Sequence, residues 1–350
     1  MALSITPTSR RISAKPKVYI HRVGKAYHRY MDAATEAALA EFADVVSDGP
    51  TEAVRPVDEL TQRLRGCSAI LSLAGGWTDE ITADVLRAAG TVKVICIAHW
   101  GGQLLEAARQ SDILICEGSN ANTLAVAEYT VTAALMGIRR LHAFDHALKS
   151  GAPWAEPRHE AGLLCESTVG IVGLGRIGSF CARYFSALGA KVIAYDPYWT
   201  AARAASIGVR LVSLHELLQQ STIVSLHLPV TAETKGMLGP KEFALIPNNA
   251  IFINSARSAL YDEKALVDEL RKERFTACLD VFDTEPLPLN HAFRAMPNVV
   301  LTPHIAGDNA AMFRRCAREA IATLRDYFAG GGLRDYSQNS AGALIEAGRL

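Results

Sequence analysis

Short apolar, β-branched runs alternate along the chain with segments in which apolar residues recur at steps of three and four. The runs predict buried strands, and the stepped segments predict helices with one apolar face. Up to residue 121 the pattern predicts strands at 18–20, 45–46, 68–73, 92–98 and 113–116, and helices at 33–43, 57–64, 82–89 and 104–110. Strands that alternate with helices favour a parallel sheet covered on both faces, so this first unit is predicted to be α/β.

A longer helical pattern runs from Asn122 or Thr123 to about Leu148, with Asn122 as its N-cap and Gly151 as its stop. We expect one connecting helix here, followed by a loop over 152–166. Further strands are predicted at 169–172, 191–196, 223–227, 250–254, 277–281 and 299–302. About six buried strands with helical crossovers suit a dinucleotide-binding sheet. A last helix, from 306 to about 329, is expected to return to the first unit, because chain ends often lie close together.

Composition narrows the class of protein. The 350 residues are 49% hydrophobic and 21% charged, which supplies enough apolar material for sizeable cores. The 36 Lys and Arg residues balance 36 Asp and Glu residues, so binding of nucleic acid through bulk positive charge is not expected. The chain contains no apolar run of about 18 residues, so no membrane-spanning segment is expected either.

The cysteines and the first residues bear on the cellular compartment. Seven cysteines are scattered along the chain, without disulfide-type or metal-type spacing. They predict reduced thiols in the cytoplasm and no metal site. Residues 1–16 are basic and rich in Ser and Pro, and we expect a frayed tail there, with an organellar address as the alternative.

One glycine-rich motif, Gly173-Leu174-Gly175-Arg176-Ile177-Gly178, lies between a predicted strand and a predicted helix. Gly173 permits a tight turn, Gly175 lets backbone approach a pyrophosphate, and Gly178 lets the helix pack closely on the strand. The helix N-terminus offers N–H groups to the phosphates. Asp196, at the end of the next strand, would bind the adenosine ribose and repel a 2′-phosphate, and no cation follows it at 197–199. The motif predicts NAD rather than NADP; the alternative is a glycine-rich turn without a ligand.

Reactive side chains follow several strands of this second unit. His227 ends the strand at 223–227, Arg257 follows the strand at 250–254 and His304 follows the strand at 299–302. Asp280 lies in the strand at 277–281, and Glu285 comes shortly after it. Taken alone, each is also explained without a function, as a histidine that stabilises the fold or as a charged side chain in solvent. Ligands of open parallel sheets bind beyond the carboxyl ends of the strands, so their shared edge favours a functional site.

Reduction of a 2-keto acid would explain these residue types. Arg257 would bind the carboxylate and the carbonyl dipole with a bidentate geometry that lysine lacks. His304 would act as the acid or base near neutral pH. Glu285 would hydrogen-bond the imidazole and favour its charged form, and a nicotinamide would carry out the redox step.

The motifs GLGRIG with Asp196, HLPVTAETKGML, INSAR, LDVFDTEPL and LTPHIAG occur in the order in which D-isomer-specific 2-hydroxyacid dehydrogenases carry them. This family includes phosphoglycerate and D-lactate dehydrogenases, and the resemblance covers Ala125 to about Tyr327. It implies two doubly wound parallel-sheet α/β domains, with a Rossmann NAD-binding domain inserted in a flavodoxin-like substrate domain and a cleft between them. The implied boundaries are 17–121 and 306–335 for the substrate domain, 122–305 for the NAD-binding domain, and tails at 1–16 and 336–350.

The resemblance also implies roles for single residues. The catalytic set would be Arg257, Glu285 and His304. Cofactor contacts would come from the glycine motif (Gly173, Gly175, Arg176, Ile177, Gly178), from Asp196 at the ribose, from Leu228, Pro229 and Thr234 over the cofactor, and from Ser255, Ala256 and Asp280 at the nicotinamide. Members are commonly homodimers joined through the cofactor domain, so we expect a homodimer that acts on a small 2-hydroxy or 2-keto acid.

Two glycine-containing loops of the first unit are expected to hold the substrate carboxylate through backbone N–H groups. They are Ala74-Gly75-Gly76 and His99-Trp100-Gly101, in which glycine lets backbone approach a ligand closely. Trp77 and Trp100 are expected to line the substrate pocket and favour a substrate with a flat or apolar side group. The alternative is that they only pack within the domain. These loops are the expected substrate-binding residues, together with Arg257.

Three departures from the family pattern lie near the substrate side. Ser258 follows Arg257 where glycine is usual, the loop after 92–98 is shorter, and 117–119 replace Asn-x-Pro. They leave the side group of the substrate open. An alternative function is an NAD(H)-sensing scaffold like the family's corepressors, although no long low-complexity arm or peptide-docking insert is evident. A formate dehydrogenase relative is disfavoured by Glu285, because that branch has glutamine there.

Overall fold

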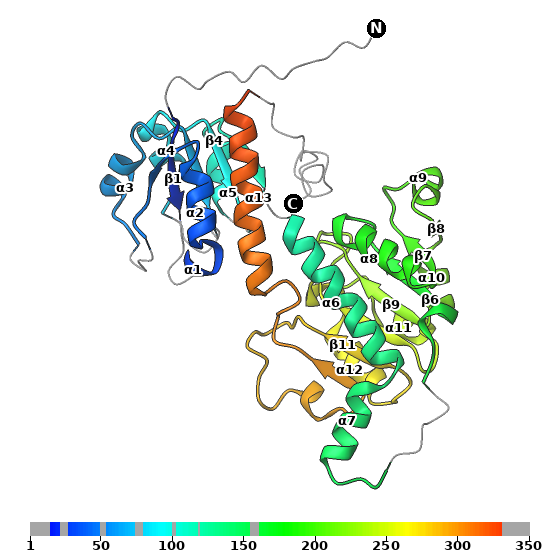
Figure 1. Ribbon diagram of the computed structural model, residues 1–350. Helices are drawn as coiled ribbons and strands as arrows, with labels where there is room; N and C mark the ends of the chain where they lie inside the picture. The colour runs from blue at the N-terminus through cyan, green and yellow to red at the C-terminus, as the bar shows by residue number, and fades with distance from the viewer. Residues whose placement is uncertain are drawn as a thin grey trace. The chain divides into compact units, whose positions relative to one another are not determined.

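The computed structural model describes residues 15–21, 27–49, 54–73, 80–99, 103–117, 120–154 and 161–330 (Figure 1). The chain divides into two compact units. Unit 1 runs up to Asn122 and resumes at Asn309, and unit 2 comprises Thr123–Asp308. Each unit contains a parallel sheet with helices between its strands, so the predicted fold class of two parallel-sheet α/β domains is confirmed.

Unit 1 is built on a five-stranded parallel sheet in the order β2-β1-β3-β4-β5. Its strands are β1 (Lys17–His21), β2 (Asp44–Val46), β3 (Ala69–Ser72), β4 (Val94–Ile97) and β5 (Leu114–Glu117). Its helices are α1 (Tyr27–Tyr30), α2 (Ala33–Ala40), α3 (Val57–Leu64), α4 (Ala83–Ala89), α5 (Gln103–Arg109) and α13 (Ala310–Phe328). Every residue of β3 and β4 is buried, which explains their apolar sequence. The strand order is that of flavodoxin-like sheets.

Helix α13 belongs to unit 1 although most of that unit precedes residue 123. It packs against α1, α2, β4 and β5 (Figure 1). The Asn309 side chain caps the helix by accepting a hydrogen bond from the N–H of Met312. The helix begins at Ala310 and not at the expected residue 306, because the N–H of Ala306 donates instead to Asp280 within unit 2.

Unit 2 is built on a seven-stranded parallel sheet in the order β12-β11-β10-β9-β6-β7-β8. Its strands are β6 (Thr168–Val172), β7 (Lys191–Tyr195), β8 (Arg210–Leu211), β9 (Ile223–Leu226), β10 (Ile251–Asn254), β11 (Thr276–Leu279) and β12 (Val299–Leu301). Its helices are α6 (Asn120–Ile138, which begins in unit 1), α7 (Leu141–Lys149), α8 (Arg176–Ala187), α9 (Ala201–Ala205), α10 (Leu214–Gln220), α11 (Pro240–Leu245) and α12 (Glu263–Leu270), with 3-10 turns η3 (Leu164–Glu166), η4 (Ser258–Leu260) and η5 (Ala292–Ala295). Counted from β6, this is the Rossmann strand order with one additional strand.

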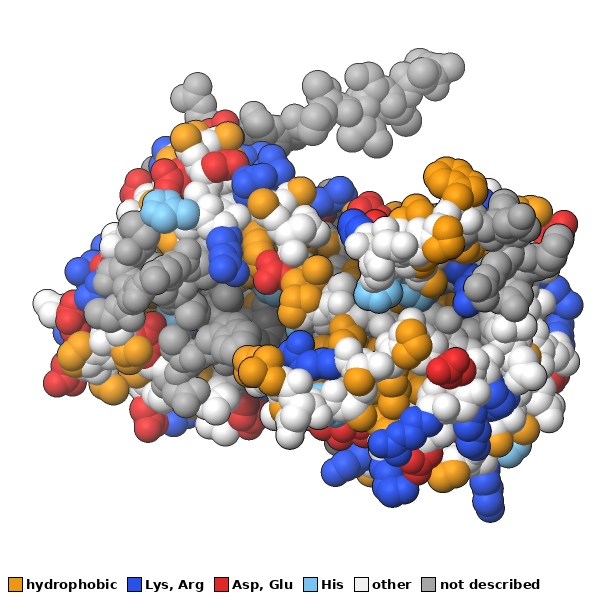
Figure 2. All heavy atoms as spheres, turned by 90° about the horizontal axis from the view of Figure 1, so that it is seen from below, with side chains coloured by type: hydrophobic (Ala, Val, Ile, Leu, Met, Phe, Trp, Pro, Cys, Tyr) orange, Lys and Arg blue, Asp and Glu red, His pale blue; other side chains and the backbone are white. Residues whose placement is uncertain are grey.

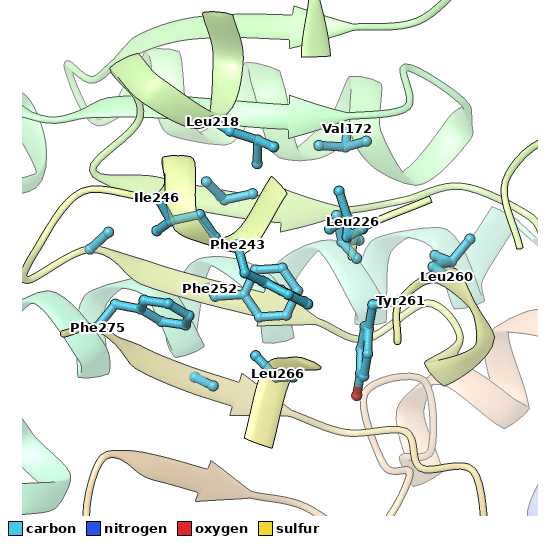
Figure 3. Packing of buried hydrophobic residues seen from close by; sticks show 14 of the residues in the cluster. Val172, Leu218, Leu226, Phe243, Ile246, Phe252, Leu260, Tyr261, Leu266 and Phe275 are labelled. Atoms are coloured by element: carbon cyan, nitrogen blue, oxygen red, sulfur yellow. The ribbon is translucent and has the colours of Figure 1, made fainter. Parts of the chain in front are cut away.

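Strand β10 lies between the two apolar clusters that form the core of unit 2. Its alternate residues face two apolar clusters, with Phe252 in one and Ile253 in the other. Figure 3 shows Phe252 packed with Phe243 of α11 and Tyr261, and its ring centroid lies 5.6 and 6.1 Å from theirs in edge-on contacts. Because β10 and Tyr261 flank the segment that carries Arg257, both ends of that segment are anchored in the core.

The prediction of one connecting helix from 122 or 123 to 148 is wrong. Asn122 lies inside α6, and α6 and α7 are separate helices. Arg140 between them has a left-handed φ of 53°, and the carbonyl of Ile138 accepts the N–H of Gly162 at 3.0 Å in place of a helical donor. The apolar step from Ile138 to Leu141 continues across the break, so the periodicity does not reveal it.

The sequence pattern also misses several short elements, among them α1, β8 and η3. Strand β8 has only two residues, lies at the sheet edge and exposes Arg210, so it forms no apolar run. The 3-10 turn η3 lies within the expected loop over 152–166, of which 155–160 lie outside the described residues.

Candidate active site

The phosphate loop connects β6 to α8, and its glycines fit a close approach of backbone. Gly173 has a left-handed φ of 97°, and a β carbon there would lie 2.7 Å from Cδ2 of Leu228. At Gly178 a β carbon would lie 2.0 Å from the carbonyl oxygen of Gly173. Gly175 is the N-cap of α8 and has no side chain to cover the N–H groups behind it. The loop and the N-terminus of α8 therefore fit the pyrophosphate of a dinucleotide.

Asp196 follows β7 directly, beside this loop. One carboxylate oxygen accepts the N–H of Leu174 at 2.8 Å, and the other accepts the N–H of Tyr198 at 2.9 Å. Each oxygen keeps a further lone pair, so the carboxylate can still accept from ribose hydroxyls. A cation that the sequence reading overlooked lies close in the chain: the guanidinium of Arg203 is 3.9 Å from the ring centroid of Trp199.

The segment after β9 comes next along the sheet. The Leu228 side chain occupies the space that a β carbon at Gly173 would need, and Thr234 closes its own loop by donating to the carbonyl of Pro229 at 2.6 Å. His227 has Nε2 2.9 Å from Oγ of Ser225. Burial lowers the pKa of His227 to about 3, so this imidazole is neutral at physiological pH and is a poor candidate for the acid of the reaction.

The turn after β10 presents Arg257 on the surface. Asn254, which is fully buried, accepts the N–H of Ala256 at 2.9 Å and donates to the carbonyl of Arg257 at 2.8 Å. Asn254 therefore shapes this turn, and sequence reasoning missed it because it acts only through backbone. Ser258, which stands where the family usually has glycine, is buried as the first residue of η4, and Ser255 lies 3.5 Å from Thr130 through their hydroxyl oxygens.

His304 and Glu285 form the pair that the sequence predicts. Nδ1 of His304 lies 2.7 Å from Oε2 of Glu285, and Oε1 of Glu285 accepts the N–H of Phe282 at 2.9 Å. Partial burial opposes ionisation of Glu285, but the hydrogen bonds from His304 and Phe282 and the charge of Arg257 outweigh it and lower the pKa. Nδ1 is thus engaged, which leaves Nε2 of the imidazole to face a substrate.

Asp280 holds the backbone around His304. Its carboxylate is fully buried and accepts the N–H of Ile305 at 2.9 Å and that of Ala306 at 2.8 Å. His304 itself has φ 56°, a left-handed conformation that is uncommon outside glycine. The two N–H groups that follow His304 are therefore fixed while its own backbone is strained, as is frequent at functional sites.

Unit 2 brings these groups to one edge of its sheet. Arg257, Glu285 and His304 follow β10, β11 and β12, and the phosphate loop follows β6 in the same parallel sheet. A hollow in this unit, of about 400 Å³, is lined by residues at or just before the start of β6, β9, β10, β11 and β12, together with residues of α6 and α7. It therefore lies at the amino ends of the strands, opposite the edge at which such sheets bind their ligands.

The expected substrate-binding residues of unit 1 are only partly described. Ala74, Gly75, Gly76, Trp77, Trp100 and Gly101 lie outside the described residues. His99, which follows β4, has Nδ1 3.0 Å from the hydroxyl of Tyr30, and its ring makes an edge contact with Phe313 at 5.7 Å.

Other kinds of site were also considered. The described ranges contain no group of three or more His, Cys, Asp or Glu residues arranged to hold a metal ion. Across the same ranges, no helix combines the length and apolarity required to cross a membrane. All seven cysteines are free thiols. On the face drawn in Figure 2, basic and acidic side chains are interspersed, in keeping with their equal numbers.

Strand order and phosphate loop together place unit 2 in the class of dinucleotide-binding domains. Residues 131–306 match the family model for the "D-isomer specific 2-hydroxyacid dehydrogenase, NAD binding domain". Among curated relatives, the chain is 33% identical over 316 residues to a D-3-phosphoglycerate dehydrogenase of Mycobacterium bovis, covering 89% of this chain and 58% of the relative. It is also 33% identical over 325 residues to a glyoxylate reductase of Thermofilum pendens, covering 89% and 92%.

A solved structure agrees with these matches. The D-lactate dehydrogenase with NAD+ from Lactobacillus jensenii is similar with a TM-score of 0.73 and 25% identity, over 91% of this chain and 98% of that one. The chain belongs to the D-isomer specific 2-hydroxyacid dehydrogenase family, and unit 2 is its NAD-binding domain. The chain spans 58% of the length of the mycobacterial relative.

Proposed function

We propose that this protein is an NAD-dependent oxidoreductase that interconverts D-2-hydroxy acids and 2-keto acids. The observation that carries the proposal is the contact of 2.7 Å between His304 and Glu285 at the sheet edge that also carries the phosphate loop. It combines an acid–base pair with a dinucleotide site in one unit. The nicotinamide, when bound, supplies or accepts the hydride.

The three side chains have separate roles in this proposal. Arg257 binds the substrate carboxylate and carbonyl through its guanidinium fork. His304 donates a proton from Nε2 to the oxygen of the keto group during reduction and takes it back during oxidation. Because the pKa of Glu285 is lowered, its carboxylate is ionised at neutral pH and favours the protonated imidazole.

The remaining assignments follow the same pattern. The backbone of Gly173, Gly175, Arg176, Ile177 and Gly178 holds the pyrophosphate at the N-terminus of α8, and Asp196 holds the ribose. Further contacts are assigned to Leu228, Pro229 and Thr234 over the cofactor and to Ser255, Ala256 and Asp280 near the nicotinamide. The loops 74–76 and 99–101 of unit 1 hold the substrate carboxylate.

The relatives favour an enzyme over a scaffold. They are named as dehydrogenases and reductases, and none of those cited gives the corepressor-like scaffold any support. Their substrates differ from one another, so the side group of the substrate stays open. Because all seven cysteines are free thiols, the proposal places the enzyme in the reducing cytoplasm.

The test is turnover. The full chain is mixed with NADH and a panel of 2-keto acids that differ only in the side group, and the loss of nicotinamide absorbance is followed. At least one acid should be reduced, and chiral chromatography should show the D-hydroxy acid as the product. Tight NADH binding without turnover of any acid would favour the scaffold, and an L-product would contradict the family stereochemistry.

A homodimer joined through unit 2 is also proposed. Helix α7 has no buried residue, and its apolar side chains Leu141 and Leu148 are 56% and 48% exposed. A helix of this length is stable mainly through burial of its apolar face. A second copy of the chain, packed through this part of the NAD-binding domain, would supply that burial.

A further inference from the structure

Tyr129 on α6 makes a contact that the proposed reaction does not use. Its hydroxyl oxygen lies 2.6 Å from Oγ1 of Thr302, although the two residues are 173 positions apart in the chain. Thr302 directly follows β12 and lies two residues before His304. Oγ1 of Thr302 in turn lies 2.6 Å from Oδ1 of Asp280. The contact thus connects α6 to the carboxylate that holds residues 304–306, called the histidine loop below.

The direction of these hydrogen bonds is fixed by chemistry. Oγ1 of Thr302 donates to Oδ1 of Asp280, and this bond uses the single hydroxyl proton of Thr302. Tyr129 must then donate its own proton to Thr302. Burial, as the largest influence, raises the pKa of Tyr129, which keeps the phenol protonated and able to donate.

Asp280 connects the hydrogen bonds of Tyr129 and Thr302 to the candidate catalytic histidine, His304. Its Oδ1 accepts from Thr302 and from the N–H of Ile305, and its Oδ2 accepts from the N–H of Ala306. A fully buried carboxylate is costly unless donors satisfy it, so each donor restricts its orientation. Loss of one donor would let the carboxylate rotate, and the two N–H groups after His304 would move with it.

We propose that Tyr129 is a positioning residue for His304. Its hydroxyl orients Asp280 through Thr302, and Asp280 then holds the histidine loop in the left-handed conformation in which Nδ1 meets Glu285. The inference rests on the proposed role of His304 as the proton donor. It assigns a function to a tyrosine that touches none of Arg257, Glu285 or His304 in the contacts above.

Tyr129→Phe removes only the hydroxyl and tests the proposal. The kcat of keto-acid reduction should fall about tenfold, the value of roughly one buried hydrogen bond. The Kd of NADH should change less than the kcat, because the substitution leaves the phosphate loop and Asp196 intact. Because the imidazolium would lose part of its hold on Glu285, the pH at which kcat/KM falls should move downwards. Tyr184→Phe on α8, which also removes a hydroxyl from a half-buried tyrosine of unit 2, is the matched control and should leave the kcat and the pH profile unchanged.

Two substitutions at Thr302 provide an independent test should Tyr129→Phe fail to fold. Thr302→Ser keeps the hydroxyl and should retain wild-type kcat and pH profile, whereas Thr302→Val should reproduce the defect expected of Tyr129→Phe. The double variant Tyr129→Phe/Thr302→Val should be no slower than Thr302→Val alone, because the two substitutions break the same series of hydrogen bonds.

The outcomes separate this inference from the proposed function. A lower Tm with unchanged kcat and pH profile in Tyr129→Phe, or wild-type behaviour of Thr302→Val, would show that Tyr129 is only structural and would overturn the inference. Full turnover by His304→Ala would instead overturn the proposed function, and the inference with it.

Discussion

The imidazole of His304 is held through two different parts of the residue. Its Nδ1 meets Glu285, and its strained backbone is followed by two N–H groups that Asp280 accepts. Glu285 is itself oriented by the N–H of Phe282. This double support fixes which ring nitrogen is available for the substrate, as general acid–base catalysis requires.

Replacement of Glu285 by glutamine tests the charge in this pair. The fold lowers the pKa of Glu285 from its ordinary value of 4.5, so the wild-type carboxylate is ionised throughout a neutral assay range. Glu285→Gln keeps a hydrogen-bonding oxygen but no longer stabilises the imidazolium. For keto-acid reduction, the fall of kcat/KM at high pH should therefore move down by about one pH unit. Superimposable pH profiles of variant and wild type would contradict the pairing.

Asp196 is expected to set the coenzyme preference by its charge. Asp196→Ala removes the carboxylate that repels a 2′-phosphate, so the ratio of kcat/KM for NADPH to that for NADH should rise by at least about tenfold. Asp196→Asn is the control for its structural bonds to Leu174 and Tyr198, since the amide oxygen can still accept one of those N–H groups. If neither variant alters the ratio, the preference lies elsewhere, with Arg203, the first cation after Asp196 in the chain, as the candidate.

At the scale of elements, the turn after β10 shows how the sheet presents a charged group. β10 is buried along its whole length, and Asn254 at its end folds the next residues back through two hydrogen bonds. Arg257 is thus exposed on a segment whose ends are anchored, and its position depends on the fully buried amide of Asn254.

Asn254→Ala should therefore weaken substrate binding. Without the two hydrogen bonds the turn loosens, and the KM of the keto acid should rise about tenfold while the Kd of NADH changes less, because the phosphate loop and Asp196 stay intact. Asn254→Asp keeps the acceptor for Ala256 but loses the donor to Arg257, so an intermediate KM is expected. A lower Tm with an unchanged KM would show that Asn254 supports only the fold.

The strands were predictable because most of them are buried and their apolar runs are continuous, as in β3 and β10. The break between α6 and α7 was not, because its cause is distant in sequence: Gly162 donates to Ile138, and Arg140 turns left-handed. Apolar periodicity records which face is buried and not where the backbone bonds change.

At the scale of the whole molecule, the chain leaves unit 1 near residue 122, forms unit 2 and returns at Asn309. Sequence reasoning predicts Arg257, Glu285 and His304 because the proposed chemistry requires those residue types. It misses Asn254 and Tyr129, because both are assigned roles that act through other groups. Their buried hydrogen bonds are visible only in the folded structure.

The proposed homodimer gives the exposed face of α7 a role that can be tested. Leu141→Glu with Leu148→Glu places two charges on that face, and the variant should be a monomer in analytical ultracentrifugation where the wild type is a dimer. Leu289→Glu, at a leucine that is 90% exposed elsewhere in unit 2, is the matched control and should remain a dimer. A wild-type monomer, or a variant dimer of unchanged affinity, would rule out this interface.

The most direct test of the account is the rate of the chemical step with and without the imidazole of His304. His304→Ala and wild type are each saturated with NADH, mixed with the best keto acid of the panel, and followed through a single turnover. The account predicts a rate constant lower by about two to four orders of magnitude in the variant, with the Kd of NADH unchanged. An unchanged rate constant would contradict it.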